Sequence, residues 1–206
     1  LLDGMSAIPQ LMAPVTERIH RHDAYAGFQI GMGMLAEDTT VINDMTPENL
    51  AWLQGLIVEL ATQLKAAGFD VVELHCAATQ ILKYMTVSRT NARTDQYGAD
   101  TLENRTRFIC ETIKGIKEAC GQEHPVMDAV EENDADLGDS DGFLTLEESI
   151  ADARAFEAAG ADTFYLRLSV PGRHIAQFAP DLMFSGYQCE GMTGFGTRAD
   201  FSQHFG

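Results

Sequence analysis

The sequence predicts an α/β fold in which helices cover a parallel sheet. Short apolar segments alternate with amphipathic helical segments, and a helix–glycine–strand pattern occurs twice, at 65–75 and 157–167. Alternating units with wholly apolar strands are typical of buried parallel sheets. Both a doubly wound sheet and a (β/α)8 barrel satisfy this order. No GxGxxG motif follows the first strand, which disfavours a dinucleotide-binding fold.

The first segments carry the signals of a helix followed by a buried strand. We expect a helix over residues 6–22, although Pro9 and Pro14 weaken its first half. Residues 25–30 are apolar and lead into closely spaced glycines, which predicts a buried strand that runs into a Gly-rich loop.

A second helix start follows at Thr46-Pro47, because threonine is a good N-cap and proline suits the first helical position. Apolar residues then recur at helical spacing up to Leu64, and Gly68 is expected to end the helix. Residues 71–75 are rich in β-branched side chains and predict the next strand.

The second half of the chain repeats this order after a long polar loop. Thr145 and Glu148 have the spacing of a capping box, which predicts a helix start. The expected elements are a helix over 101–119, a strand over 125–130, a helix over 145–159, a strand over 162–169 and a loop over 170–206 with a helix beginning near its end.

Composition narrows the function classes. The formal net charge of −17 argues against binding to nucleic acid or to an anionic membrane, since phosphates would be repelled. The four cysteines are widely spaced and form no CxxC pair, so neither a disulfide framework nor a zinc or iron–sulfur site is indicated here. No apolar run is long enough to span a bilayer. We expect a soluble, cytoplasmic protein with a small-molecule substrate, and leave a homo-oligomer open.

Polar side chains stand at the carboxyl ends of three predicted strands: Gln29, His75 and Arg167. In a (β/α)8 barrel this end of the strands carries the active site. A site at that edge of the sheet is therefore expected.

One long stretch resembles a signature of the old yellow enzyme family. AGFDVVELH at 67–75 matches the family's fourth barrel strand, and QIGMGM at 29–34 resembles its third strand in the anaerobic 2-enoate and 2,4-dienoyl-CoA reductase branch. In the run RTNARTDQYGADTLENRTRF at 89–108, the matching residues are Asn91, Arg93, Thr94, Asp95, Tyr97, Gly98, Glu103, Asn104, Arg105, Arg107 and Phe108.

The resemblance implies a (β/α)8 TIM barrel that binds FMN and uses NAD(P)H as electron donor. This chain would hold about strands three to six, as one partial domain over residues 1–206. It begins with Leu rather than Met, which also predicts a segment of a longer protein. The family's FMN-phosphate site follows the seventh and eighth strands, outside these residues. The sequence leaves open whether an iron–sulfur cluster and a second pyridine-nucleotide domain follow, as in the anaerobic branch.

Two residues acquire binding roles by the resemblance. Gln29 would hydrogen-bond the flavin pyrimidine ring, whose mixed donor and acceptor edge suits an amide. His75 would hold a substrate carbonyl oxygen, which activates the β-carbon toward hydride and stabilises the developing enolate. The alternatives are a solvent-facing strand-end glutamine and a hydrogen-bonded core histidine.

Three positions depart from the family pattern. Ala78 replaces the second carbonyl ligand, Gln80 replaces the tyrosine proton donor, and Ala129 replaces the flavin-contacting arginine of the fifth strand. Glutamine cannot act as a general acid at neutral pH. These replacements favour a different substrate, a displaced acid or a catalytically altered member.

Other residues are candidates for the missing roles. Arg167, on the sixth strand, is a candidate cation beside flavin N1. His174, in the following loop, is a candidate proton donor, with Tyr84 as the second choice. Cys76 suggests a nucleophile, but a small core side chain is the simpler interpretation. The charged residues of 89–107 are expected to form a salt-bridged loop that braces the site.

The acidic segment 137–148 imitates a calcium-binding loop, with Asp139, Asp141 and Glu148 at ligand spacing. Leu137 stands where the first carboxylate is required, so we expect no metal site.

These observations predict an FMN-dependent oxidoreductase that transfers hydride from reduced flavin to the activated C=C bond of an enone- or enoate-type substrate. The alternative is a catalytically altered or non-catalytic barrel that binds flavin or another ligand. Ala78, Gln80 and Ala129 are the residues that favour the alternative.

Overall fold

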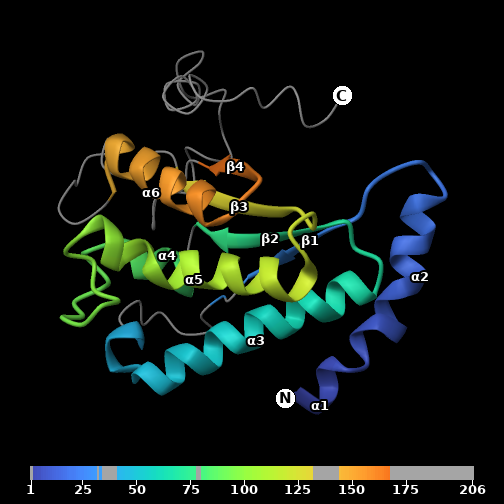
Figure 1. Cartoon of the computed structure of the whole chain (residues 1–206), viewed down its shortest axis with the longest axis horizontal. Coiled ribbons are helices and arrows are strands. Elements are labelled where there is room, and N and C mark those ends of the chain that lie inside the picture. Colours follow the sequence, from blue (N-terminus) through green and yellow to red (C-terminus); the bar gives the residue numbers. More distant parts are fainter. Residues whose placement is uncertain (1, 32, 34–40, 78–79, 132–143, 168–206) are drawn as a thin grey trace, which may run out of the picture.

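The computed structural model describes residues 2–31, 33, 41–77, 80–131 and 144–167. Their centre is a parallel sheet whose four strands lie in chain order (Figure 1). A doubly wound sheet reverses its strand order at a switch point, whereas the strands of a barrel follow one another. The observed order therefore selects the barrel alternative. The strands are β1 (Gly27–Ile30), β2 (Val71–Cys76), β3 (Val126–Glu131) and β4 (Thr163–Arg167).

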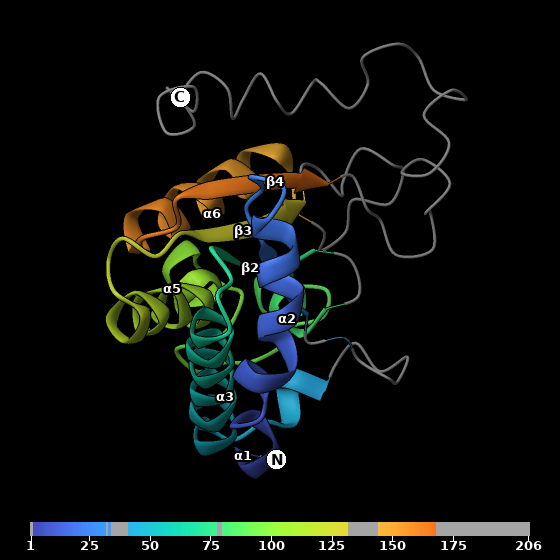
Figure 2. The ribbon, with the colours of Figure 1, turned by 90° about the vertical axis from the view of Figure 1, so that its right-hand side faces the viewer.

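Three long helices cover one face of this sheet (Figure 2). They are α3 (Pro47–Ala66), α5 (Leu102–Cys120) and α6 (Leu146–Ala159). Their apolar sides and the strand residues that face them form one core, which includes Ile57, Leu74, Phe108, Ile113 and Phe156. None of the helices among the described residues has the length and apolar composition to cross a bilayer.

The helix starts form as the capping signals predicted. The Thr46 side chain accepts the N–H of Asn49, and the Asn49 side chain accepts the N–H of Thr46 in return. Thr145 and Glu148 make the same reciprocal pair at the start of α6. Each pair satisfies N–H groups that the first helical turn leaves without a partner.

One helix forms as predicted, and the structure adds short helices that the sequence did not predict. The helix predicted over 6–22 forms as α2 (Ile8–His20), but a short helix that the sequence did not predict, α1 (Leu2–Met5), precedes it, and the two lead to the edge of the sheet where the strands begin. The stretch read as one polar loop contains α4 (Ile81–Thr86), and a 3-10 helix, η1 (Val41–Asp44), lies near it. Leu82 to Thr86 are all buried, the polar Lys83 and Thr86 included, so α4 has no exposed face and shows no amphipathic period.

The two helix–glycine–strand units each make the same pair of hydrogen bonds to the strand before them. After each glycine an aspartate accepts a hydrogen bond from the backbone of the preceding strand region: Asp70 from Ala26 and Asp162 from Val126, both at 2.7 Å. The aspartate N–H donates back to the carbonyl of the same residue, at 2.8 Å in both units. Each unit therefore anchors the start of its own strand to the strand before it. This sets the register that places the strand ends side by side.

Candidate functional site

One face of the sheet is turned away from the helices, and we call it the inner face. Val72 and Leu74 pack in the helix-covered core, so Glu73 and His75, which alternate with them on β2, lie on the inner face. The register extends this assignment to the neighbouring strands. The described side chains of the inner face are those of Gln29, Val71, Glu73, His75, Met127, Ala129, Thr163 and Tyr165.

Glu73 joins the two residues that the sequence predicts as ligands. Its Oε1 accepts a hydrogen bond from Gln29 Nε2 at 2.6 Å and lies 3.5 Å from His75 Nδ1. The Glu73 side chain is 19% exposed and the His75 side chain 5%. A carboxylate acceptor in such partial burial makes a stronger hydrogen bond than a neutral group. The structure thus brings Gln29 and His75 together through a third side chain.

Sequence reasoning missed Glu73, although a signal was present. It lies two residues before His75 on a predicted strand, and strand side chains alternate between faces, so the two share a face. The buried position of His75 is compatible with both a ligand-binding residue and the hydrogen-bonded core histidine considered above. If His75 is a ligand-binding residue, its substitution should weaken substrate binding. If it is a core histidine, its substitution should lower stability instead.

Gln80 occupies the space beside the glycines that follow β1. Gly33 and Gln80 form an isolated antiparallel bridge, and a Cβ atom at Gly31 would lie 3.4 Å from Gln80 Oε1. That oxygen is buried and has no hydrogen-bond donor among the described residues. The position assigned to the family's tyrosine therefore carries an acceptor and a weakly acidic amide, as the sequence indicated, and no general acid.

The structure places the other predicted site residues to different extents. Tyr84 is 4% exposed and belongs to the core cluster through α4, and its predicted role as the second candidate acid stays a prediction. Arg167 ends β4 two residues beyond Tyr165, where its backbone pairs with Glu131, and its predicted role as the cation beside flavin N1 stays a prediction. His174 and Ala78 lie outside the described residues, so their predicted roles stay predictions.

The helix-covered side of β2 and β3 carries polar groups of a different kind. Cys76 and Asp128 are both buried there. Burial, with the nearby Asp128 carboxyl as the next cause, raises the pKa of the Cys76 thiol well above its usual range. Burial likewise raises the pKa of Asp128 to about 8. A thiol that resists ionisation is a poor nucleophile, which supports the core interpretation of Cys76.

A small cavity of about 10 Å³ adjoins this buried group. Its polar lining includes Lys83, Ser149 and Asp152, and Arg105 Nε donates to Asp152 Oδ1 at 2.8 Å. Burial raises the pKa of Asp152 to about 6, although Arg105 opposes the rise. A cavity of this size accommodates about one water molecule. It is therefore far too small for a flavin or a substrate, and the candidate site lies on the inner face.

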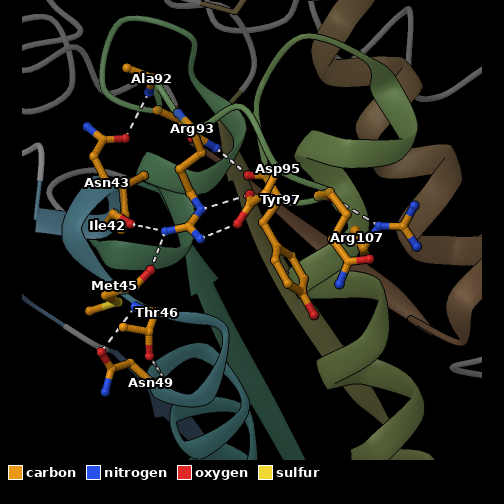
Figure 3. A network of polar contacts seen from close by, with 12 residues as sticks. Ile42, Asn43, Met45, Thr46, Asn49, Ala92, Arg93, Asp95, Tyr97 and Arg107 are labelled. Carbon is orange, nitrogen blue, oxygen red and sulfur yellow. Dashed lines mark hydrogen bonds and ion pairs between the residues drawn. The ribbon is translucent and has the colours of Figure 1, made fainter.

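The signature loop is braced by its charged residues, as predicted (Figure 3). Arg93 Nη1 donates to the carbonyl oxygens of Ile42 and Met45, both at 2.6 Å, and the guanidinium pairs with Asp95. Arg107 donates to the Gln96 carbonyl oxygen at 3.0 Å. The Arg93 side chain is only 6% exposed, so this cation stabilises the loop and is not available to a ligand.

Comparison with known proteins bears on the fold and the family of the chain. The model of the NADH:flavin oxidoreductase / NADH oxidase family matches residues 12–135. The cinnamate reductase of Clostridium sporogenes is 33% identical over 134 residues, which covers 54% of this chain and 20% of that protein. The chain thus spans about a fifth of the length of this curated relative.

Two solved structures extend the comparison. A 2-naphthoyl-CoA reductase in complex with 2-naphthoyl-CoA is 31% identical, with a TM-score of 0.57 over 61% of this chain and 18% of that one. The old yellow enzyme homologue from Zymomonas mobilis has a TM-score of 0.64 over 78% of this chain and 52% of that one, at 18% identity. The second likeness shows the fold alone. The predicted fold class, a (β/α)8 barrel of which about strands three to six are present, is confirmed.

Proposed function

Because the chain belongs to the NADH:flavin oxidoreductase / NADH oxidase family, we propose that the full-length protein is an FMN-dependent oxidoreductase that uses NAD(P)H to reduce the activated C=C bond of an enone- or enoate-type substrate. The observation that carries this proposal is the convergence of Gln29 and His75 on Glu73 at the inner face. The relative named cinnamate reductase supports an enoate-type substrate.

The residues present fit FMN at Gln29. Its side chain is exposed on the inner face, and its Nε2 donates to Glu73, so the carbonyl oxygen is directed away from that bond. An amide that offers both an acceptor and a donor matches the mixed edge of a flavin pyrimidine ring. Gln29 would hold that edge, and the bound cofactor would supply hydride-transfer chemistry.

His75 would bind the substrate oxygen. Its Nδ1 faces Glu73, so Nε2, on the opposite side of the ring, is directed away from the carboxylate. A hydrogen bond to an oxygen that gains negative charge lowers the barrier of the reaction. Ala129, the register partner of His75, adds no polar group, so of these two neighbours only His75 can bind an oxygen through its side chain.

The proton would come from His174. Gln80 is not an acid at neutral pH, and Tyr84 is buried in the core. His174 follows the strand that ends at Arg167, and the carboxyl ends of parallel barrel strands meet at one edge of the sheet.

A catalytically altered flavin-binding protein is the second candidate. It is favoured by the packing of Gln80 against Gly31 and Gly33, which puts an amide without acid function at the tyrosine position. Ala129 likewise offers no cation to the flavin. Such a protein would bind FMN and accept electrons from NADH, but it would not reduce an alkene.

Anaerobic absorbance of the full-length protein separates the two candidates. NADH should bleach the flavin bands, and cinnamate or cyclohexenone should restore them. His75→Ala should slow the restoration about tenfold or more, because hydrogen bonds to charged groups contribute about 1.5–3 kcal/mol. The matched control is His124→Ala, which removes a buried histidine just before the start of β3 and should leave the rate unchanged. Reduced flavin that persists with every enone and enoate would favour the altered protein.

A further inference from the structure

We propose that Glu73 is a positioning residue that holds the Gln29 amide and the His75 ring in the orientations needed for cofactor and substrate binding. The inference rests on the function proposed above, because Glu73 acts through these two side chains. It assigns a role to a residue that lies outside the family signature at 89–108.

The geometry that carries the inference is built into the sheet. Gln29 and Glu73 are register partners on neighbouring strands, and their side chains meet at 2.6 Å. His75 lies on the same face two residues farther along β2, with its Nδ1 at 3.5 Å from the same carboxylate oxygen. Strand spacing therefore sets all three positions, without help from a loop.

The carboxylate selects one orientation of the Gln29 amide. An ionised carboxylate only accepts hydrogen bonds, so only the NH2 end of the amide can face it. The carbonyl oxygen of Gln29 is then turned outward, where it can accept an N–H group such as that of the flavin pyrimidine ring. A neutral amide in place of Glu73 would tolerate both orientations of Gln29, since it both donates and accepts.

The same carboxylate also lies beside His75, at ion-pair distance and not in a hydrogen bond, and its charge orients the ring. With Nδ1 facing Glu73, the other ring nitrogen is directed away from the carboxylate, which is the direction a bound oxygen must come from. The His75 side chain is buried, so a misaligned ring has little room to correct itself. Loss of the Glu73 charge should therefore weaken substrate binding as well as FMN binding.

Glu73→Gln tests this role because it removes the charge and keeps the shape. In the full-length protein we expect the FMN dissociation constant to rise about tenfold, the effect of one lost charge-assisted hydrogen bond. At saturating FMN we expect the KM for cyclohexenone to rise several-fold. The matched control is Glu59→Gln on α3, where Glu59 Oε1 accepts from Gln63 Nε2 at 2.7 Å, and it should change neither value.

A double-mutant cycle separates positioning from direct contact. If Glu73 acts on FMN through Gln29, Glu73→Gln should add less than about a factor of two to the dissociation constant in a Gln29→Ala background. The same tenfold factor in both backgrounds would overturn the proposal, as would unchanged FMN binding in Glu73→Gln alone. If Glu73→Gln does not fold by circular dichroism, Glu73→Asp replaces it, since the shorter side chain also loses the contact.

The result also shows which claim has failed. An unmodified protein that binds FMN while Glu73→Gln has no effect contradicts the positioning role alone. An unmodified protein that binds no FMN contradicts the proposed function, and the positioning role with it.

Discussion

The sheet formed by β2 and β3 carries ionisable side chains on both faces. The carboxyl group on one face has hydrogen-bond donors, and the carboxyl group on the other face has no N–H or O–H donor among the described residues. On the inner face, Glu73 accepts a hydrogen bond from Gln29 and lies against His75. On the helix-covered face, Asp128 is fully buried and meets the weakly polar thiol of Cys76. Neither Asp128 oxygen receives an N–H or O–H hydrogen bond among the described residues.

The difference shows that position relative to the helices decides what a carboxyl group does. A carboxylate with donors nearby can accept their hydrogen bonds and orient them. A carboxyl group buried without donors takes up a proton instead, as the pKa of about 8 for Asp128 indicates. We therefore expect substitutions on the inner face to change ligand binding, and substitutions on the helix-covered face to change the free energy of unfolding.

The largest expected effect comes from the core side of β2. Leu74→Ala should lower the free energy of unfolding by about 2–5 kcal/mol, because it removes a fully buried side chain and leaves a cavity. Urea unfolding of the full-length protein measures this loss. A loss well under 1 kcal/mol would mean that the helices do not pack on this face as described.

Asp128→Val should raise the free energy of unfolding by about 1–3 kcal/mol at pH 8, because it removes a buried polar group that lacks donors. The gain should depend on pH. The carboxyl pKa is about 8 in the folded protein and 3.8 in the unfolded chain, so the folded state holds the extra proton between these values. The carboxyl group therefore destabilises the fold progressively as pH rises from about 4 to 8, and hardly at all below pH 4.

Unfolding curves at pH 5 and pH 8 check this sign. The advantage of Asp128→Val over the unmodified protein should be larger at pH 8. An advantage that shrank as pH rose would contradict a protonated Asp128.

A substitution in the signature loop, which lies on neither face of the sheet, gives a stability change to compare with those of the two faces. Arg93→Lys should lower the free energy of unfolding by about 1–2 kcal/mol, because lysine cannot bind two carbonyl oxygens and a carboxylate in one plane. Arg154→Lys, at an exposed position on α6, should stay within about 0.5 kcal/mol of the unmodified protein. Faster limited proteolysis between Val87 and Thr101 in Arg93→Lys alone would locate the effect in the signature loop.

Glu73→Gln should have the smallest effect on stability, within about 1 kcal/mol, since pairs that retain contact with solvent contribute little. The contrast with Leu74→Ala, one residue along the same strand, then separates the faces directly. Thermal unfolding of both variants side by side is sufficient. If Glu73→Gln destabilised the protein as much as Leu74→Ala, Glu73 would be a structural residue and not a positioning one.

Local signals in the sequence predicted most of the elements and part of the site. Thr46 and Thr145 marked helix starts correctly, because capping needs only residues a few positions apart. Gly160 has the positive φ that a glycine after a helix readily adopts. By contrast, α4 was missed because it is held by burial on all sides, and burial depends on distant parts of the chain.

The sequence by itself determined the alternation of helices and strands, the family signature and the chemistry available at the strand ends. Only the tertiary structure decided the strand order that selects a barrel, the pairing of Gln29 with Glu73, and the burial of Asp128 without donors. The physical reason is that capping and alternation act between residues close in sequence. Register instead joins residues 36 or more positions apart, such as Met127 and Thr163 or Gln29 and Glu73.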